Sequence, residues 1–259
     1  MLWIVLATLG VLAVSAVAVA GLLLVRRTTF LRRHLGENDV AGLLFGAVGV
    51  LYGALLAFVV FAAWEGYSRA EQAVTAEAAD LVAVYRDSEQ FPQPLRGRVQ
   101  EALRTYANIV MSAEWQSHGS LRPHTTPDLL NPLWDLYGRV NPSTGRGENQ
   151  LAAASDRLHQ LELQRHLRHL SGEAVLPGIF WPVLVVGGIV LVLFSYVFTQ
   201  NSVLVQALTT GLLAALLCLV LLLILSLNQP FTGPVAVSQQ PFRHALAVFH
   251  AMDLRAPTP

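Results

Sequence analysis

Residues 37–67, ENDVAGLLFGAVGVLYGALLAFVVFAAWEGY, decide the fold of this chain. The part from Val40 to Trp64 carries no charge and exceeds the roughly 20 residues that cross a hydrocarbon core as a helix. Glycine is a poor helix former, yet this apolar helix contains Gly42, Gly46, Gly49 and Gly53. The glycines recur every three or four residues, so the stretch predicts a membrane helix with a glycine strip along one side.

The composition of the whole chain is that of a membrane protein. Hydrophobic residues make up 54% and charged residues only 13%, which is too apolar for an ordinary soluble domain of this length. The uncharged runs of membrane-spanning length are Leu2–Val25, Val40–Trp64, Ala174–Phe198 and Val203–Leu227. None alternates in polarity as a barrel strand does. We therefore expect an all-α integral membrane protein with four transmembrane helices.

The connection between the second and third runs predicts a helical extramembrane domain. Apolar residues at helical spacing extend the second helix to Tyr85, where the sequence FPQP ends it. Further helices are expected over 95–113, over 127–140 with Thr126 as cap and Pro127 as first residue, and over 151–170, with a loop at 141–149. The expected division is 1–64 with the first two spans, 65–173 as helical domain, 174–227 with the last two spans, and 228–259 as C-terminal tail.

The glycine strip allows close approach of another helix, because packing of small residues drives helix association in lipid. Two interpretations stay open: the strip packs within one chain, or it forms a subunit interface or pore-lining surface. The second favours an oligomer, since four helices enclose little space. Three aromatic residues of the same helix, Phe45, Tyr52 and Phe58, are candidates for a hydrophobic gate, although such spacings also serve packing.

Charged and histidine side chains are absent from the four runs, which argues against a proton-coupled carrier. Asn38 and Asp39 precede the second run, where they cap the helix or contact ions at a pore mouth. The polar residues inside the runs either line a weakly selective pore or bond the preceding turn; they are Ser15, Tyr52, Ser195, Tyr196, Gln206, Thr209 and Thr210.

One histidine-rich face in the helical domain is a candidate metal site, formed by His159, Glu162, His166 and His169. Neighbouring pairs such as Glu162 and His166 have the spacing to chelate a transition metal or to sense pH, whereas a solvated face is the alternative. We expect no cofactor and no enzyme, because nucleophile triads, phosphate loops and zinc-type cysteine pairs are absent. A formal charge of +0 argues against a nucleic-acid partner.

Several segments together form a family pattern. They are ENDVAG at 37–42, GVLYGALLAFVV at 49–60, WEGYSRAEQAVTAEAADLVAVYR at 64–86, LQRHLRHLSG at 163–172 before LPGIFWPVLVVGG, and NQPFTGPVAVSQQPF at 228–242. In these segments the chain resembles a bacterial bestrophin-like family of four-span membrane proteins of unknown function. The resemblance implies a distant relation to bestrophins, which are oligomeric anion channels.

Two classes of function follow. The first is an oligomeric bestrophin-like channel or pore that passes anions such as chloride, with the second helix at the pore or subunit interface. The alternative is a non-conducting membrane scaffold or sensor whose helical domain binds a protein partner. The expected partners are thus the lipid bilayer, further copies of the chain and anions.

The arginines predict the orientation in the cell membrane. Arg26, Arg27, Arg32 and Arg33 lie in the short connection between the first two runs. The positive-inside rule places that connection in the cytoplasm and residues 65–173 outside it. Arginines near the other ends of the spans, Arg69, Arg165, Arg168 and Arg243, and the cytosolic domain of bestrophins argue for the opposite orientation.

Overall fold

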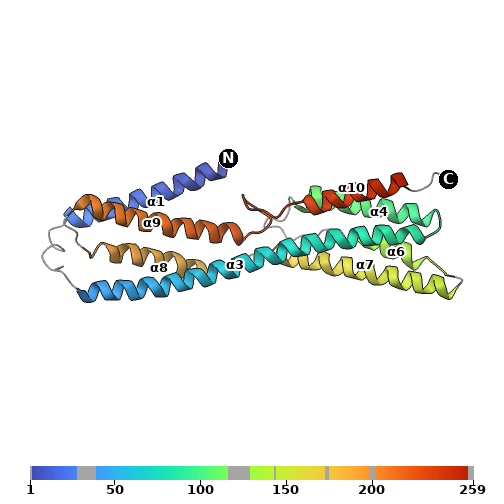
Figure 1. Cartoon of the computed structure of the whole chain (residues 1–259), viewed down its shortest axis with the longest axis horizontal. Helices are drawn as coiled ribbons and strands as arrows, with labels where there is room; N and C mark the ends of the chain where they lie inside the picture. The colour runs from blue at the N-terminus through green and yellow to red at the C-terminus, as the bar shows by residue number, and fades with distance from the viewer. Residues whose placement is uncertain are drawn as a thin grey trace. The chain divides into compact units, whose positions relative to one another are not determined.

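The computed structural model describes residues 2–27, 39–115, 129–142, 144–172, 175–198 and 202–255, and all regular elements in these residues are helical (Figure 1). The all-α fold class is thereby confirmed. The chain divides into two compact units. We call Met1–Gly66 with Ala174–Asn228 the membrane unit, and Tyr67–Glu173 with Gln229–Pro259 the helical unit.

The membrane unit contains α1 (Leu2–Arg27), the first half of α3 (Asp39–Asp87), α8 (Phe180–Ser195) and α9 (Val203–Leu227). In the described residues, α1, α3 and α9 are long and apolar enough to cross a membrane. The apolar α8 has 16 residues, so at 1.5 Å per residue it spans about 24 Å, less than a hydrocarbon core of about 30 Å. The third predicted span, Ala174–Phe198, is thus helical over a shorter part than expected.

Tyrosines set against glycines hold the membrane unit together. Tyr52 of α3 donates its hydroxyl to the Leu184 carbonyl at 2.5 Å, and a methyl group at Gly187 would overlap its ring. Tyr196, after α8, donates to the Ala18 carbonyl of α1 at 2.6 Å. These bonds satisfy phenol groups that would otherwise be unpaired in an apolar setting. Gly187 at the Tyr52 contact and Gly21 at the Tyr196 contact provide space for a large ring beside a neighbouring backbone.

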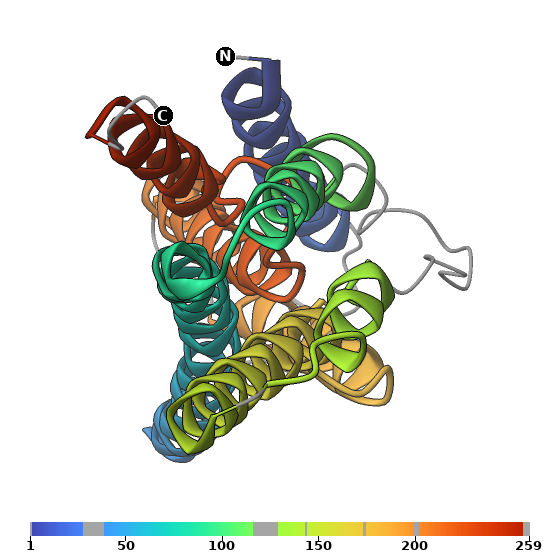
Figure 2. The same ribbon diagram turned by 90° about the vertical axis from the view of Figure 1, so that its right-hand side faces the viewer.

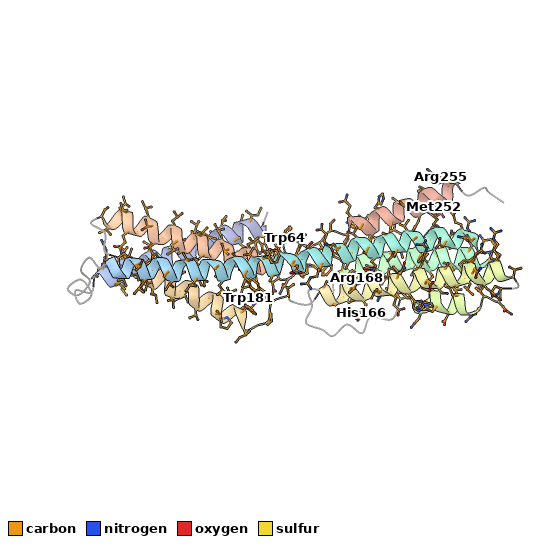
Figure 3. The ribbon with its side chains drawn as sticks, turned by 60° about the horizontal axis from the view of Figure 1, so that its bottom comes forward. Trp64, His166, Arg168, Trp181, Met252 and Arg255 are labelled. Carbon is orange, nitrogen blue, oxygen red and sulfur yellow. The ribbon has the colours of Figure 1, made fainter. Side chains whose placement is uncertain are left out.

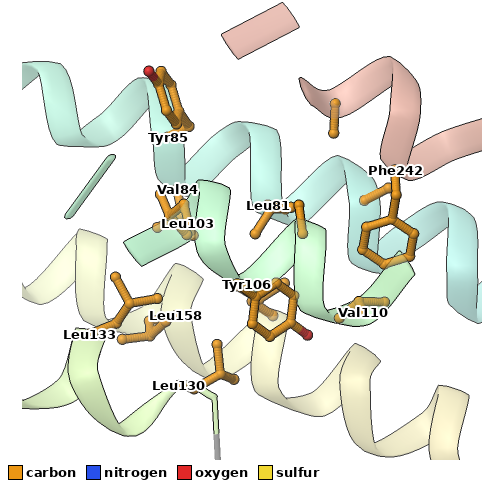
Figure 4. Packing of buried hydrophobic residues seen from close by; sticks show 14 of the residues in the cluster. Leu81, Val84, Tyr85, Leu103, Tyr106, Val110, Leu130, Leu133, Leu158 and Phe242 are labelled. Carbon is orange, nitrogen blue, oxygen red and sulfur yellow. The ribbon is translucent and has the colours of Figure 1, made fainter. Parts of the chain in front are cut away.

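The helical unit contains the second half of α3, η1 (Ser88–Gln90), α4 (Leu95–Ile109), the π-helix η2 (Val110–Glu114), α6 (Asn131–Gly138), α7 (Gly145–Ser171) and α10 (Gln240–Arg255). Their apolar stripes meet in one core, part of which Figure 4 shows around Leu81, Leu103, Tyr106 and Leu158. Each of these residues is at most 1% exposed, as expected for stripes repeating every three or four positions.

The observed helices confirm one predicted extension and correct one predicted loop. The second span continues as a single helix of 49 residues to Asp87, which confirms the predicted extension through Tyr85. The predicted loop at 141–149 was wrong in its second half, because α7 already begins at Gly145. The Thr144 hydroxyl accepts a hydrogen bond from the Gly147 amide at 3.2 Å and caps the helix there. Thr126 and Pro127 lie outside the described residues.

The segment that was predicted to be a C-terminal tail contains the helix α10, which packs into the helical unit. Phe242, Ala245 and Phe249 are buried, and the Phe249 ring stacks on Tyr85 with centroids 4.0 Å apart. Asp253 accepts hydrogen bonds from the Tyr85 hydroxyl and from Arg104 of α4, each at 2.5 Å. Burial and the bond to Asp253 raise the pKa of Tyr85, so its hydroxyl remains a donor.

Candidate functional site

Most of the glycine strip of α3 has no neighbour among the residues that the structure describes. The buried residues of this half of the helix are Tyr52, Leu56, Val59, Ala63 and Gly66. Gly53 follows Tyr52 by one position, so the strip lies about 100° around the helix from the buried face. A methyl group at Gly46, Gly49 or Gly53 would meet no atom within 4 Å in the described part of the chain. At Gly42 it would meet only Phe198 Cε1, at 3.8 Å.

The three gate candidates lie in three different surroundings. The ring of Phe45 stacks on Phe194 with centroids 5.6 Å apart and meets the edge of Phe198 at 5.3 Å. Tyr52 is buried against α8, as described above. Phe58 is 65% exposed on the surface of the membrane unit. The chain by itself therefore does not bring the three side chains together.

The polar groups of the membrane unit are mostly bonded to backbone. The Ser195 hydroxyl donates to the Val192 carbonyl at 2.6 Å, and Thr209 donates to Val205 at 3.1 Å, as hydroxyls in apolar helices commonly do. The buried Gln206 amide donates to the Phe198 carbonyl at 2.6 Å. Asn38 lies outside the described residues, and Asp39 is the first residue of α3.

The histidine face of α7 is on the surface and partly engaged with neighbours. The His159 ring meets Trp134 of α6 edge-on at 4.4 Å, and its Nδ1 lies 2.9 Å from the Ser155 carbonyl oxygen. Glu162 and His166 are exposed, and His169 is half-buried. Within the described ranges, no group of three or more His, Cys, Asp or Glu side chains is arranged to hold a metal ion.

A buried ionic cluster joins three helices of the helical unit. It consists of Glu77 on α3, Tyr106 on α4 and Arg168 on α7, none more than 1% exposed. Arg168 donates to the Glu77 carboxylate through Nε at 2.5 Å and through Nη2 at 3.2 Å. The Tyr106 hydroxyl donates to the same carboxylate. A two-point contact of this kind fixes the orientation of both side chains as well as their distance.

The surroundings keep the Tyr106 hydroxyl protonated. Burial raises the pKa of Tyr106 well above its ordinary value, and the Glu77 carboxylate raises it further. The guanidinium of Arg165 lies over the Tyr106 ring, 5.4 Å from its centroid. Figure 3 shows Arg168 and His166 on α7.

The cluster was not predicted from the sequence. Arg168 follows buried Leu161 by seven residues, so it continues the buried face of the helix.

Apolar helices of membrane-spanning length, joined to a unit with its own buried core, define a helical integral membrane protein. A family model described as the bestrophin-like domain matches residues 11–242, which is most of the chain. The chain belongs to the bestrophin-like family, and this family indicates an ion-channel kind of function. Comparison with curated proteins and with solved structures found no match.

Proposed function

We propose that the protein is an oligomeric channel that passes anions such as chloride, with the glycine strip of α3 at the subunit interface or pore. The observation that carries the proposal is the open surface at Gly46, Gly49 and Gly53. Glycine weakens a helix, so these three glycines lower the stability of α3 without a compensating contact among the described residues. Contact with another copy would compensate for this loss of stability, because small residues let helices associate closely in lipid.

The distribution of charge supports anions as the permeating species. The described part of the membrane unit has no charged side chain between Asp39 and Glu65, nor in α8 or α9. Arg26 and Arg27 form the last turn of α1, and the sequence adds Arg32 and Arg33 before the next span. A cluster of one sign at the end of a membrane helix concentrates ions of the opposite sign there. Uncharged walls with a positive mouth favour a weakly selective anion path.

Protein reconstituted into liposomes is expected to release chloride faster than empty liposomes and to pass chloride in preference to sodium. Chloride efflux and sodium uptake are measured separately on the same vesicle preparation, across pH and voltage. Chloride flux equal to that of empty liposomes would overturn the conducting function. A preference for sodium would contradict the proposed anion selectivity but would still show that the protein forms a pore.

The orientation is a second part of the proposal: residues 65–173 face away from the cytoplasm, because the arginine-rich connection at 26–33 stays inside. Two cysteine variants, Ala153→Cys in the helical unit and Thr29→Cys, are made in a Cys218→Ala background. In intact cells whose outer layers admit the reagent, an impermeant thiol reagent is expected to label only Ala153→Cys. Labelling of Thr29→Cys alone would show that the orientation is the opposite of the proposed one.

A non-conducting scaffold or sensor is the second candidate function. The observation that favours it is the independent core of the helical unit, with its buried Glu77–Arg168 pair, because an extramembrane domain folded on its own core offers a surface to another protein. The liposome measurement separates the two candidates. A scaffold gives no flux above empty vesicles, even when the reconstituted protein is folded.

A further inference from the structure

A leucine stripe lies exposed on α7, outside the membrane unit. Leu163, Leu167 and Leu170 are 54%, 40% and 52% exposed, and they follow one another at steps of four and three. Buried Leu158 and Leu161 lie on the opposite side of the same helix. An apolar stripe at this spacing is typical of a helix that packs against a further helix surface.

A groove lies elsewhere on the helical unit, between α3 and α10, with a volume of about 690 Å³. Its apolar lining includes Val74, Ala78, Ala79 and Val82 of α3 and Ala245 and Val248 of α10, and its polar lining includes Thr75, Gln240 and His244. On the α3 wall, Glu71 lies at the N-terminal end of the groove and Arg86 at its C-terminal end. Figure 2 shows that α7 and α10 lie on different sides of α3, so stripe and groove belong to different faces.

Two ion pairs fix which residues of α3 and α7 lie at the same position along the helix axes, here called the same height. Arg168 pairs with Glu77 at 2.5 Å, and Arg157 pairs with Asp87 at 2.5 Å, so the two helices run antiparallel. Counting from the first pair places Leu167 level with Ala78, and Leu163 level with Val82. Leu170 is level with Thr75, beside Val74. The stripe therefore matches the apolar part of the α3 wall, from Val74 to Val82, in position along the axis and in length.

We propose that the leucine stripe of one copy docks into the α3–α10 groove of the next copy around a ring. The inference rests on the proposed homo-oligomer and adds the contact made outside the membrane. Copies inserted alike in one bilayer lie at the same depth, so an interface between two different faces closes into a ring only when both faces have matching heights. The match between Leu167 and Ala78 meets that requirement.

Charge complements the apolar match. Arg86 at one end of the groove is level with residue 159 of α7, and exposed Glu162 lies three residues from that position, about 4.5 Å along the axis. In the ring, the position of Glu162 along the axis in one copy is therefore close enough to that of Arg86 in the next copy for their side chains to span the axial separation. Such a pair fixes the direction and height of docking more than it adds affinity.

The test is disulfide cross-linking of the full chain in membranes, in a Cys218→Ala background. The double variant Leu167→Cys/Ala79→Cys is expected to give, on oxidation, a ladder of covalent multimers up to the full ring, because the two residues are within one position of equal height. Both positions accept the change without loss of core packing, since Leu167 and Ala79 are exposed. Each single variant is expected to remain uncross-linked.

The matched control is Ala152→Cys/Ala79→Cys, which places the α7 cysteine about 21 Å too far along the axis and should give no ladder. Dimers from Leu167→Cys alone would show that the stripe packs on itself and would overturn the inference. An oligomer without any cross-link from the double variant would overturn it too, while leaving the proposed channel intact. A monomer in the membrane would overturn both.

Discussion

Replacing Arg168 by methionine is expected to lower the free energy of unfolding of the helical unit by about 3–5 kcal/mol, the usual cost of removing one partner of a buried ion pair. The variant keeps most of the aliphatic volume but leaves the Glu77 carboxylate buried without its counter-charge. Thermal and denaturant unfolding of the purified full chain, followed by circular dichroism, measures the loss. A variant that unfolds like the unmodified chain would show that the pair does not form.

The double variant Glu77→Gln/Arg168→Met is the control for this effect. Its glutamine is uncharged and still accepts the hydrogen bond that the Tyr106 hydroxyl donates to Glu77. Most of the lost stability should therefore return, because replacing a buried ion pair by neutral groups is often close to neutral. If single and double variants lose the same stability, lost packing rather than an unpaired charge causes the effect.

Gly46→Leu and Gly49→Leu are expected to abolish the native oligomer while leaving each chain folded. No described atom of the same chain lies near an added side chain at either position, so a leucine should destabilise the monomer little. At a close backbone contact between copies, the added bulk cannot be relieved by a small shift. The oligomeric mass in nanodiscs and the chloride flux should fall together in both variants.

Ala54→Leu provides the matched control on α3. Ala54 is exposed and follows Gly53 by one position, so its side chain points about 100° further from the buried face than the strip does. The control adds the same apolar bulk to the same helix and is expected to keep the oligomer. If both glycine variants keep the oligomer, the glycine strip is not part of the subunit interface.

Local periodicity was enough to predict the elements whose structure depends on their own residues. Apolar residues at helical spacing predicted that α3 continues to Tyr85, and α4 follows its stripe from Leu95. The start of α7 was missed because Gly145 and Gly147 are typical of loops, whereas the decisive feature is the Thr144 cap. The helix α10 was missed because Pro-rich sequence precedes it and its apolar stripe is short.

The candidate site was harder to predict because it depends on which helices are neighbours. Periodicity grouped the glycines of α3, but only the fold shows that Gly187 accommodates Tyr52 while Gly49 faces open space. A charged residue within a helix is typical of a solvated face, so the seven-residue step from Leu161 to Arg168 was not enough to predict burial against Glu77. The aromatic spacing at Phe45 is compatible with a gate and with a packing cluster, and its contact partner Phe194 lies far away in the sequence.

The most direct test of the proposed channel is a reconstruction of the protein in lipid nanodiscs by electron cryo-microscopy. We expect a symmetric ring of identical chains, viewed along the membrane normal, with a continuous axial path. The α3 faces that carry Gly46 and Gly49 should lie against the neighbouring copy or the path. A single chain in the nanodisc, or a ring whose glycine faces contact only lipid, would contradict the proposal.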